Sequence, residues 1–322
     1  MSGDELGLLD RRLLFVTGKG GVGKTSVAAS LALLASQQGQ RTLVCEIDAK
    51  GDLAAAFESG PLAFAPRELA PNLSGMAMNT EESLREYLKL QLKVPMLGRI
   101  GPVARTFDFV ADAAPGVKEI LTVGKLCYEV RERTFDLIVV DASATGHVIG
   151  QLAAPQAINE LVKVGRVREQ TRWMVDMLAD PATTAAVIVS APEEMPVSET
   201  LDLAERMRIE TDVLLAAVIV NKVLPELFGR SEEAIFHSLR EPAALDALAA
   251  AVGAPVAQVA PVLDAAQLAV TLRRTRAGHL TRLRHELPKN VPLLYVPYLF
   301  NRTHGVRSTR AVAEALAAEI GS

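Results

Sequence analysis

The stretch Gly18–Thr25, read as G-K-G-G-V-G-K-T, matches G-x-x-x-x-G-K-[ST], the pattern of a phosphate-binding P-loop. An apolar run, Leu13–Val16, comes directly before it and predicts a buried strand. After it, Val27, Leu31 and Leu34 recur at the spacing of one helix face. A strand, a glycine-rich loop and a helix in this order are the context that the motif requires. The sequence therefore predicts a nucleoside triphosphate site here.

Each residue type in the predicted loop suits a triphosphate. Glycines let the backbone turn tightly with its N–H groups pointing inward, and the helix N-terminus adds positive potential. Lys24 is expected to reach the β- and γ-phosphate oxygens and to act in catalysis, and the Thr25 hydroxyl is expected to ligate Mg²⁺. The predicted nucleotide-binding residues of the loop are Gly18, Lys19, Gly20, Gly21, Val22, Gly23, Lys24, Thr25 and Ser26.

Bulk composition argues against several functional classes. The chain has 322 residues, of which 49% are hydrophobic and 22% charged, as is typical of a well-packed globular protein. A net charge of −4 and few aromatic residues argue against nucleic acid as a partner. Cys45 and Cys127 are widely separated and are expected to be reduced thiols. No apolar run approaches the ~18 residues of a membrane span, and the acidic N-terminus is unlike a signal peptide, so we expect a cytoplasmic protein.

Apolar segments alternate with helical patterns along the chain. The predicted strands are 13–16, 41–47, 73–78, 135–140, 185–190, 213–220 and 292–296. This alternation predicts an α/β fold, a P-loop NTPase with a mostly parallel sheet covered by helices on both faces. Because ligands of such sheets bind at the carboxyl ends of the strands, Asp48, Asp141 and Asn221 are expected at the same edge as the P-loop.

We expect a single domain over residues 1–322, with helical insertions at about 80–131, 150–180 and 225–289. A helix is predicted over 156–178. A basic run within 273–284 contains five arginines and is interpreted as a solvated helix face, with a partner or membrane-surface role as the alternative.

Lys19 makes the loop unusual, because it stands one residue after the first glycine. This K-G-G-x-G-K-[ST] version resembles the deviant P-loop ATPases, a class that includes the ArsA-type and tail-anchored-protein-targeting ATPases, MinD, ParA and the nitrogenase iron protein. The resemblance implies ATP as the nucleotide. It also implies a dimer in which Lys19 reaches the nucleotide of the second subunit and takes part in catalysis. The alternative is a solvated charge on an exposed loop.

Two further segments resemble the switch loops of the ArsA-type and targeting ATPases. Asp48–Phe57, D-A-K-G-D-L-A-A-A-F, is similar to D-P-A-x-x-L-x-D-A-F, and Asp141–His147, D-A-S-A-T-G-H, is similar to D-T-A-P-T-G-H. Both matches are partial. In the second segment, A-S-A at 142–144 stands where the family pattern has T-A-P. The resemblance implies that Asp48 contacts and positions the attacking water and that Asp141 holds Mg²⁺ through water. A helix N-cap role for Asp48 is the alternative and is compatible with catalysis.

Two segments resemble the parts of the same family's sequence that bind adenine. Asn221 and Lys222, at the end of the 213–220 strand, resemble the family's adenine-binding asparagine segment, where an amide donates and accepts together. The alternative is a turn residue that closes the strand. The segment 297–305 falls where the family has P-L-x-x-x-E-[IV]-R-G, which implies backbone contacts from Pro297 and Leu299 to the base.

Two metal-binding features of this family are missing from the sequence. There is no C-x-x-C zinc motif, and two widely spaced cysteines do not make the thiolate cluster with which ArsA pumps bind metalloids. The chain therefore resembles a bacterial type that lacks both sites.

The resemblance implies a Mg²⁺-dependent ATPase that acts as a nucleotide-gated dimer and couples hydrolysis to anion transport at a membrane partner. One alternative is a targeting chaperone for tail-anchored or other hydrophobic membrane-protein clients, and another is a MinD- or ParA-like positioning ATPase. The second subunit can be the same chain or a paralogous ATPase. The further partner can be a membrane transporter subunit or a hydrophobic client, with the protein peripheral at the inner face of the membrane.

Overall fold

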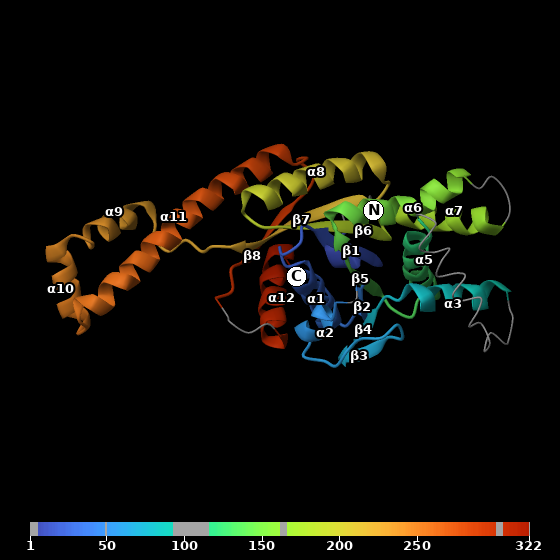
Figure 1. The fold of residues 1–322 in the computed structure, drawn as a ribbon, viewed down its shortest axis with the longest axis horizontal. Coiled ribbons are helices and arrows are strands. Elements are labelled where there is room, and N and C mark those ends of the chain that lie inside the picture. The colour runs from blue at the N-terminus through green and yellow to red at the C-terminus, as the bar shows by residue number, and fades with distance from the viewer. Residues whose placement is uncertain (1–5, 49, 93–115, 162–165, 301–304, 322) are drawn as a thin grey trace.

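An eight-stranded sheet in the order β3-β4-β2-β5-β1-β6-β7-β8 forms the centre of the chain (Figure 1). The computed structural model describes residues 6–48, 50–92, 116–161, 166–300 and 305–321. β3 runs antiparallel to β4, and the other pairings are parallel. The strands are β1 (Leu13–Gly18), β2 (Thr42–Glu46), β3 (Arg67–Ala70), β4 (Leu73–Ala77), β5 (Leu137–Ala144), β6 (Thr184–Ser190), β7 (Leu214–Val223) and β8 (Leu293–Pro297).

Helices cover both faces of the sheet, so side chains along each central strand alternate between two cores. In β1, Leu14 and Val16 belong to one core, and Leu13 and Phe15 to the other. The first core is closed by α1 (Lys24–Gln37), α2 (Asp52–Ala56) and α12 (Val306–Ile320). The second is closed by α5 (Val117–Glu132), α6 (Thr145–Leu161), α7 (Arg166–Ala179), α8 (Glu194–Glu210) and the end of α11 (Val256–Glu286). The described part of the chain confirms the predicted α/β fold.

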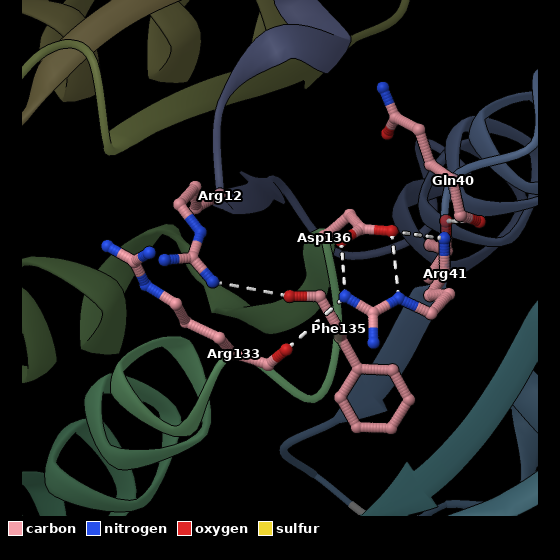
Figure 2. A network of polar contacts seen from close by, with 7 residues as sticks. Arg12, Gln40, Arg41, Arg133, Phe135 and Asp136 are labelled. Atoms are coloured by element: carbon pink, nitrogen blue, oxygen red, sulfur yellow. Dashed lines mark hydrogen bonds and ion pairs between the residues drawn. The ribbon is translucent and has the colours of Figure 1, made fainter.

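The amino ends of β1, β2 and β5 are joined by a polar network (Figure 2). Arg41 pairs with Asp136 through Nη2–Oδ1 at 2.7 Å and Nε–Oδ2 at 3.1 Å, and its backbone N–H donates to Oδ2 at 2.9 Å. Arg12 donates from Nη2 to the backbone oxygen of Phe135 at 3.3 Å. The Arg41 guanidinium holds the pKa of Asp136 below its usual value. Since the strands are parallel, this network lies at the edge opposite the P-loop and joins the strands without entering the nucleotide site.

The segment 141–147 differs from its predicted form as a loop. β5 continues to Ala144, which pairs with Gly18 of β1, and α6 begins immediately at Thr145. The predicted start of this helix near residue 156 is therefore wrong, because Pro155 lies inside α6 rather than before it. The segment is thus a strand end and a first helical turn, both fixed to the sheet.

Two strands also differ from what the sequence predicted. β7 runs past Asn221 to Val223, where it pairs with Pro297 of β8. β3 was not predicted, because Arg67–Ala70 is exposed or half-buried and has no apolar alternation. Its antiparallel pairing with β4 supplies the backbone hydrogen bonds that define it as an edge strand.

Helices α9 (Arg230–Ser238), α10 (Pro242–Val252) and α11 project from the sheet as an arm (Figure 1). The arm has its own small core, in which Phe228 and Phe236 stack with ring centroids 4.6 Å apart beside Val259 and Leu263. Among the described helices, none is by itself long and apolar enough to span a membrane. α10 and α11 meet that criterion only as a pair, and this pair is bent by 111°.

Arginines of α11 attach the arm to the body. Arg276 pairs with Glu193 at 3.2 Å, and Arg282 donates to Ser198 Oγ at 2.8 Å, so both reach the start of α8. Helix α3 (Thr80–Leu92) is attached in a similar way, since Lys125 of α5 pairs with its Glu86 at 2.6 Å. The basic run is therefore more than a solvated helix face, because two of its arginines contact the start of α8.

Candidate functional site

The P-loop joins the carboxyl end of β1 to the N-terminus of α1, and geometry requires three of its glycines. Gly18, Gly21 and Gly23 have φ values of +142°, +85° and +96°. A Cβ on Gly18 would overlap the carbonyl oxygen of Val189 in β6, and one on Gly23 would overlap the amide of Asn221 in β7. The N–H groups of the first turn of α1 then face the space where a phosphate would bind.

Lys24 and Thr25 open α1 beside the carboxylate of Asp141. The Thr25 hydroxyl donates to Asp141 Oδ2 at 2.6 Å, and Lys24 Nζ donates to the backbone oxygen of Lys19 at 3.3 Å. Asp141 reaches this position because β5 pairs with β1 in the register that sets it opposite Val16. A hydroxyl and a carboxylate are the hard oxygen donors that Mg²⁺ accepts, with water and phosphate oxygens filling its other positions. The residues present therefore fit Mg²⁺ bound to Thr25 and, through water, to Asp141.

Burial dominates the electrostatics of this site. Asp141 is 8% exposed, and burial raises its pKa to about 6, although the Thr25 hydrogen bond and the Lys24 charge act to lower it. Burial likewise lowers the pKa of Lys24, against the attraction of Asp141. Glu46, opposite Asp141 in β2, also has its pKa raised by burial. A cation bound at this sheet edge would thus stabilise the ionised forms of Asp141 and Glu46.

Asp48 follows β2 and contacts the segment that ends β5. Its Oδ1 accepts a hydrogen bond from the Ser143 hydroxyl at 3.1 Å. The chain beyond it is held by Glu46, whose Oε1 accepts the N–H groups of Lys50 and Asp52 at 3.2 Å each. The N-cap alternative for Asp48 is wrong, because the residue before the first turn of α2 is a glycine in a left-handed conformation. The structure thus brings the two predicted switch segments into contact.

Lys19 is held within its own subunit by an ion pair with Glu199 of α8. Glu199 Oε2 also accepts a hydrogen bond from the Thr145 hydroxyl at 3.3 Å, so one carboxylate joins the P-loop to the start of α6. Lys19 is thus a half-buried, paired lysine in this subunit, and its contact with the nucleotide of a second subunit stays a prediction. Sequence reasoning missed Glu199, because no motif includes it and only the placement of β6 beside β1 brings α8 to the loop.

Asn221 and Lys222 contact the P-loop backbone from β7. Asn221 Nδ2 donates to the backbone oxygen of Val22 and Lys222 Nζ to that of Gly21, both at 2.8 Å. Asn221 Oδ1 accepts the N–H of Lys222 at 2.9 Å. The alternative that Asn221 is a turn residue closing its strand is wrong, since β7 continues beyond it. The structure shows both residues holding the loop, and their contact with a nucleotide stays a prediction.

The remaining predicted residues lie around the same edge. Pro297 ends β8, and Leu299 packs against the core on the α1 face. Val22 is buried in that core beneath the loop, whereas Gly20 is exposed and Ser26 lies in the first turn of α1. Base contacts from Pro297 and Leu299 stay a prediction.

Comparison with known proteins identifies the family. The family model described as anion-transporting ATPase matches residues 11–178 and 161–237. The chain belongs to this family. The P-loop, Asp48 and Asp141 all lie inside the matched region.

Several curated relatives share part of this ATPase sequence. The ATPase BagA of Mycobacterium tuberculosis is 32% identical over 225 residues, which cover 66% of each chain. The arsenical pump-driving ATPase of Acidiphilium multivorum is 26% identical over 66% of this chain and 40% of its own. The ATPase get3 of Neurospora crassa is 30% identical over 51% of this chain and 50% of its own. The match thus spans 66% or less of the length of each of these relatives.

Within this family, the cysteines of the chain are unsuited to metalloid binding. Cys45 and Cys127 are both fully buried, and burial raises both pKa values, that of Cys127 to about 12. Soft metalloids bind thiolates, which these two residues do not provide at neutral pH from their positions in the core.

The raised pKa of Asp141 predicts a pH-dependent cost to folding. Between pH 3.8 and about 6 the folded chain holds a proton that the unfolded chain releases, so stability falls as pH rises through this window. Asp141→Asn removes that cost. In EDTA without nucleotide we expect the variant to be more stable at pH 7.5, by up to about 3 kcal/mol, with the difference closing near pH 4. Urea unfolding at the two pH values measures this, and equal stability at pH 7.5 would contradict it.

Proposed function

We propose that the chain binds ATP with Mg²⁺ and hydrolyses it at the interface of a nucleotide-gated dimer. The observation that carries the proposal is the convergence of three separate segments on the P-loop edge. Lys24 and Thr25 open α1, Asp141 lies 2.6 Å from the Thr25 hydroxyl, and Asp48 is joined to the same strand end at 3.1 Å through Ser143. Family membership supports the same activity.

In this proposal each side chain has a separate task. Lys24, with the N–H groups of α1, neutralises charge on the β- and γ-phosphates. Thr25 and, through water, Asp141 would hold Mg²⁺, which would offset the negative charge that develops on the phosphates. Asp48 accepts a hydrogen bond from the attacking water and aligns it. Because the transition state of phosphoryl transfer is loose, positioning of this kind supplies most of what the protein has to provide.

Lys19 supports the dimer in this proposal. Its ammonium group is bound to Glu199 in a single subunit, and the phosphates of a nucleotide on a second subunit offer a more highly charged alternative. When the two subunits close over ATP, Lys19 leaves Glu199 and binds the phosphates of the second subunit's nucleotide. After hydrolysis it returns to Glu199. An intersubunit cation can supply ~10³–10⁵ in rate, as arginine fingers do. The second subunit is either the same chain or a paralogous ATPase.

We propose anion transport at a membrane partner as the process that hydrolysis drives, with the chain in the cytoplasm and peripheral to the membrane. The description of the family and the arsenical pump-driving relative support this role. The buried cysteines direct the proposal towards oxyanions other than those that need thiolate ligands.

A targeting chaperone is the second candidate, because the arm exposes large apolar side chains. Val262 is 66% exposed and Leu268 59% exposed on α11, while Val252 at the end of α10 is 59% exposed. Such side chains would suit a hydrophobic client helix. The relative named ATPase get3 is compatible with this candidate but matches only 51% of the chain.

Asp48→Asn tests the hydrolytic role. We expect kcat to fall by at least about 100-fold, because water is no longer aligned by a carboxylate, while ATP affinity changes less than about twofold. Single-turnover hydrolysis and fluorescent-nucleotide binding measure the two quantities. Asp212→Asn, at the opposite edge of the sheet, is the control and should keep full turnover. Normal turnover in the Asp48 variant would overturn the role.

Glu199→Gln tests the exchange of partners by Lys19. Removing the carboxylate releases Lys19, so we expect ATP-dependent dimerisation to become about two- to fivefold tighter, as a partly exposed ion pair of up to about 1 kcal/mol implies. Analytical ultracentrifugation over a range of ATP concentrations measures it. Glu205→Gln, which breaks an exposed pair with Arg208 on the same helix, is the matched control. Weaker dimerisation in the Glu199 variant would count against the exchange.

The process that ATP hydrolysis drives is tested by comparing oxyanions with a hydrophobic tail peptide. If anion transport is the role, a panel of oxyanions should include one that raises ATP turnover several-fold. If targeting is the role, ATP-loaded protein should retain a hydrophobic tail peptide, and the pair Val262→Ser with Leu268→Ser should abolish retention without changing turnover. Retention of the peptide with no response to any oxyanion would reject transport in favour of targeting.

A further inference from the structure

Ser143 lies near the end of β5 and is 4% exposed. Its backbone oxygen accepts a hydrogen bond from the Thr17 hydroxyl at 2.9 Å, which fixes it to the strand that leads into the P-loop. Its own hydroxyl lies between two polar side chains. Gln151 Nε2 donates to it at 3.0 Å, and Asp48 Oδ1 accepts from it at 3.1 Å.

The direction of this chain of hydrogen bonds follows from the chemistry of its members. A serine hydroxyl has one proton, and an ionised carboxylate can only accept. Because Gln151 donates to the Ser143 oxygen, the serine proton points to Asp48, where the bond is strengthened by the negative charge. Gln151 Oε1 is buried and has no hydrogen-bond partner among the described residues, so the contact with Ser143 is what orients the amide.

This arrangement is not part of the pattern that the segment resembles. In D-T-A-P-T-G-H the position of Ser143 is an alanine, and the hydroxyl stands one residue earlier, where this chain has Ala142. Successive residues of a strand point to opposite faces, so the shift changes which face carries the hydroxyl. Ala142 packs into the core of the α5 face, while the Ser143 hydroxyl reaches Asp48.

We propose that Gln151 and Ser143 are positioning residues for hydrolysis, because they fix the Asp48 carboxylate through one oxygen and leave Oδ2 to face the attacking water. Glu46 holds the backbone beyond Asp48, and the serine fixes the side chain itself. The inference rests on the proposed function, since it concerns the residue that aligns water. It identifies α6, which carries Gln151, as the element that sets the orientation of Asp48.

The first test is Ser143→Ala. Loss of the oriented hydroxyl should lower kcat about tenfold while the KM for ATP and nucleotide affinity stay within about twofold, because the contact acts on the water and not on the nucleotide. Gln151→Met should lower kcat in the same way by a smaller factor. The double variant should be no slower than Ser143→Ala alone, since both changes break one chain. An unchanged kcat in Ser143→Ala, or losses that multiply in the double variant, would overturn the inference.

A control separates positioning from packing. Ser30→Ala removes an equally buried hydroxyl, which donates to the backbone oxygen of Thr309 at 2.8 Å, and should lose similar stability with unchanged kcat. If Asp48→Asn keeps normal turnover, the proposed function of Asp48 fails. If Asp48→Asn abolishes turnover and Ser143→Ala has the kcat of the wild type, only the positioning inference fails.

Discussion

The nucleotide site depends on the close approach of β1 to β6 at Gly18. A side chain there would overlap the backbone oxygen of Val189, so only glycine lets the P-loop leave the sheet at this point. The same central position, between β5 and β6, sets Asp141 beside Thr25 and brings Glu199 on α8 to Lys19. Residues far apart in the sequence meet because their strands are neighbours in the sheet.

The site buries charge that the folded chain does not fully neutralise by itself. Burial raises the pKa of Asp141 and lowers that of Lys24, so the cost of desolvating the two charges outweighs their mutual attraction. The buried charges thereby lower the free energy of unfolding of the chain without ligand, and bound Mg²⁺ and phosphates would restore it. The hydrogen-bonded ion pair of Arg41 and Asp136 at the opposite edge joins β2 and β5 without taking part in this balance.

Local motifs explain which parts could be predicted from sequence. The P-loop, its strand and its helix are specified by adjacent residues, so their prediction needed no knowledge of strand order. Contacts across the sheet could not be read in this way. Asn221 bonding to Val22 and Ser143 bonding to Asp48 both depend on which strands pair and in what register. The direct continuation of β5 into α6 was not predicted, because Pro155 lies within the helix and proline usually breaks helices.

Helix α8 connects the site to the arm through contacts near its N-terminus. Glu193 and Ser198 receive Arg276 and Arg282 of α11, and Glu199, one residue later, receives Lys19. The contacts of Lys19 and of the two α11 arginines therefore lie within about two helical turns of each other at the start of α8. Sequence motifs do not reveal this arrangement, since neither Glu199 nor the α11 arginines belong to one.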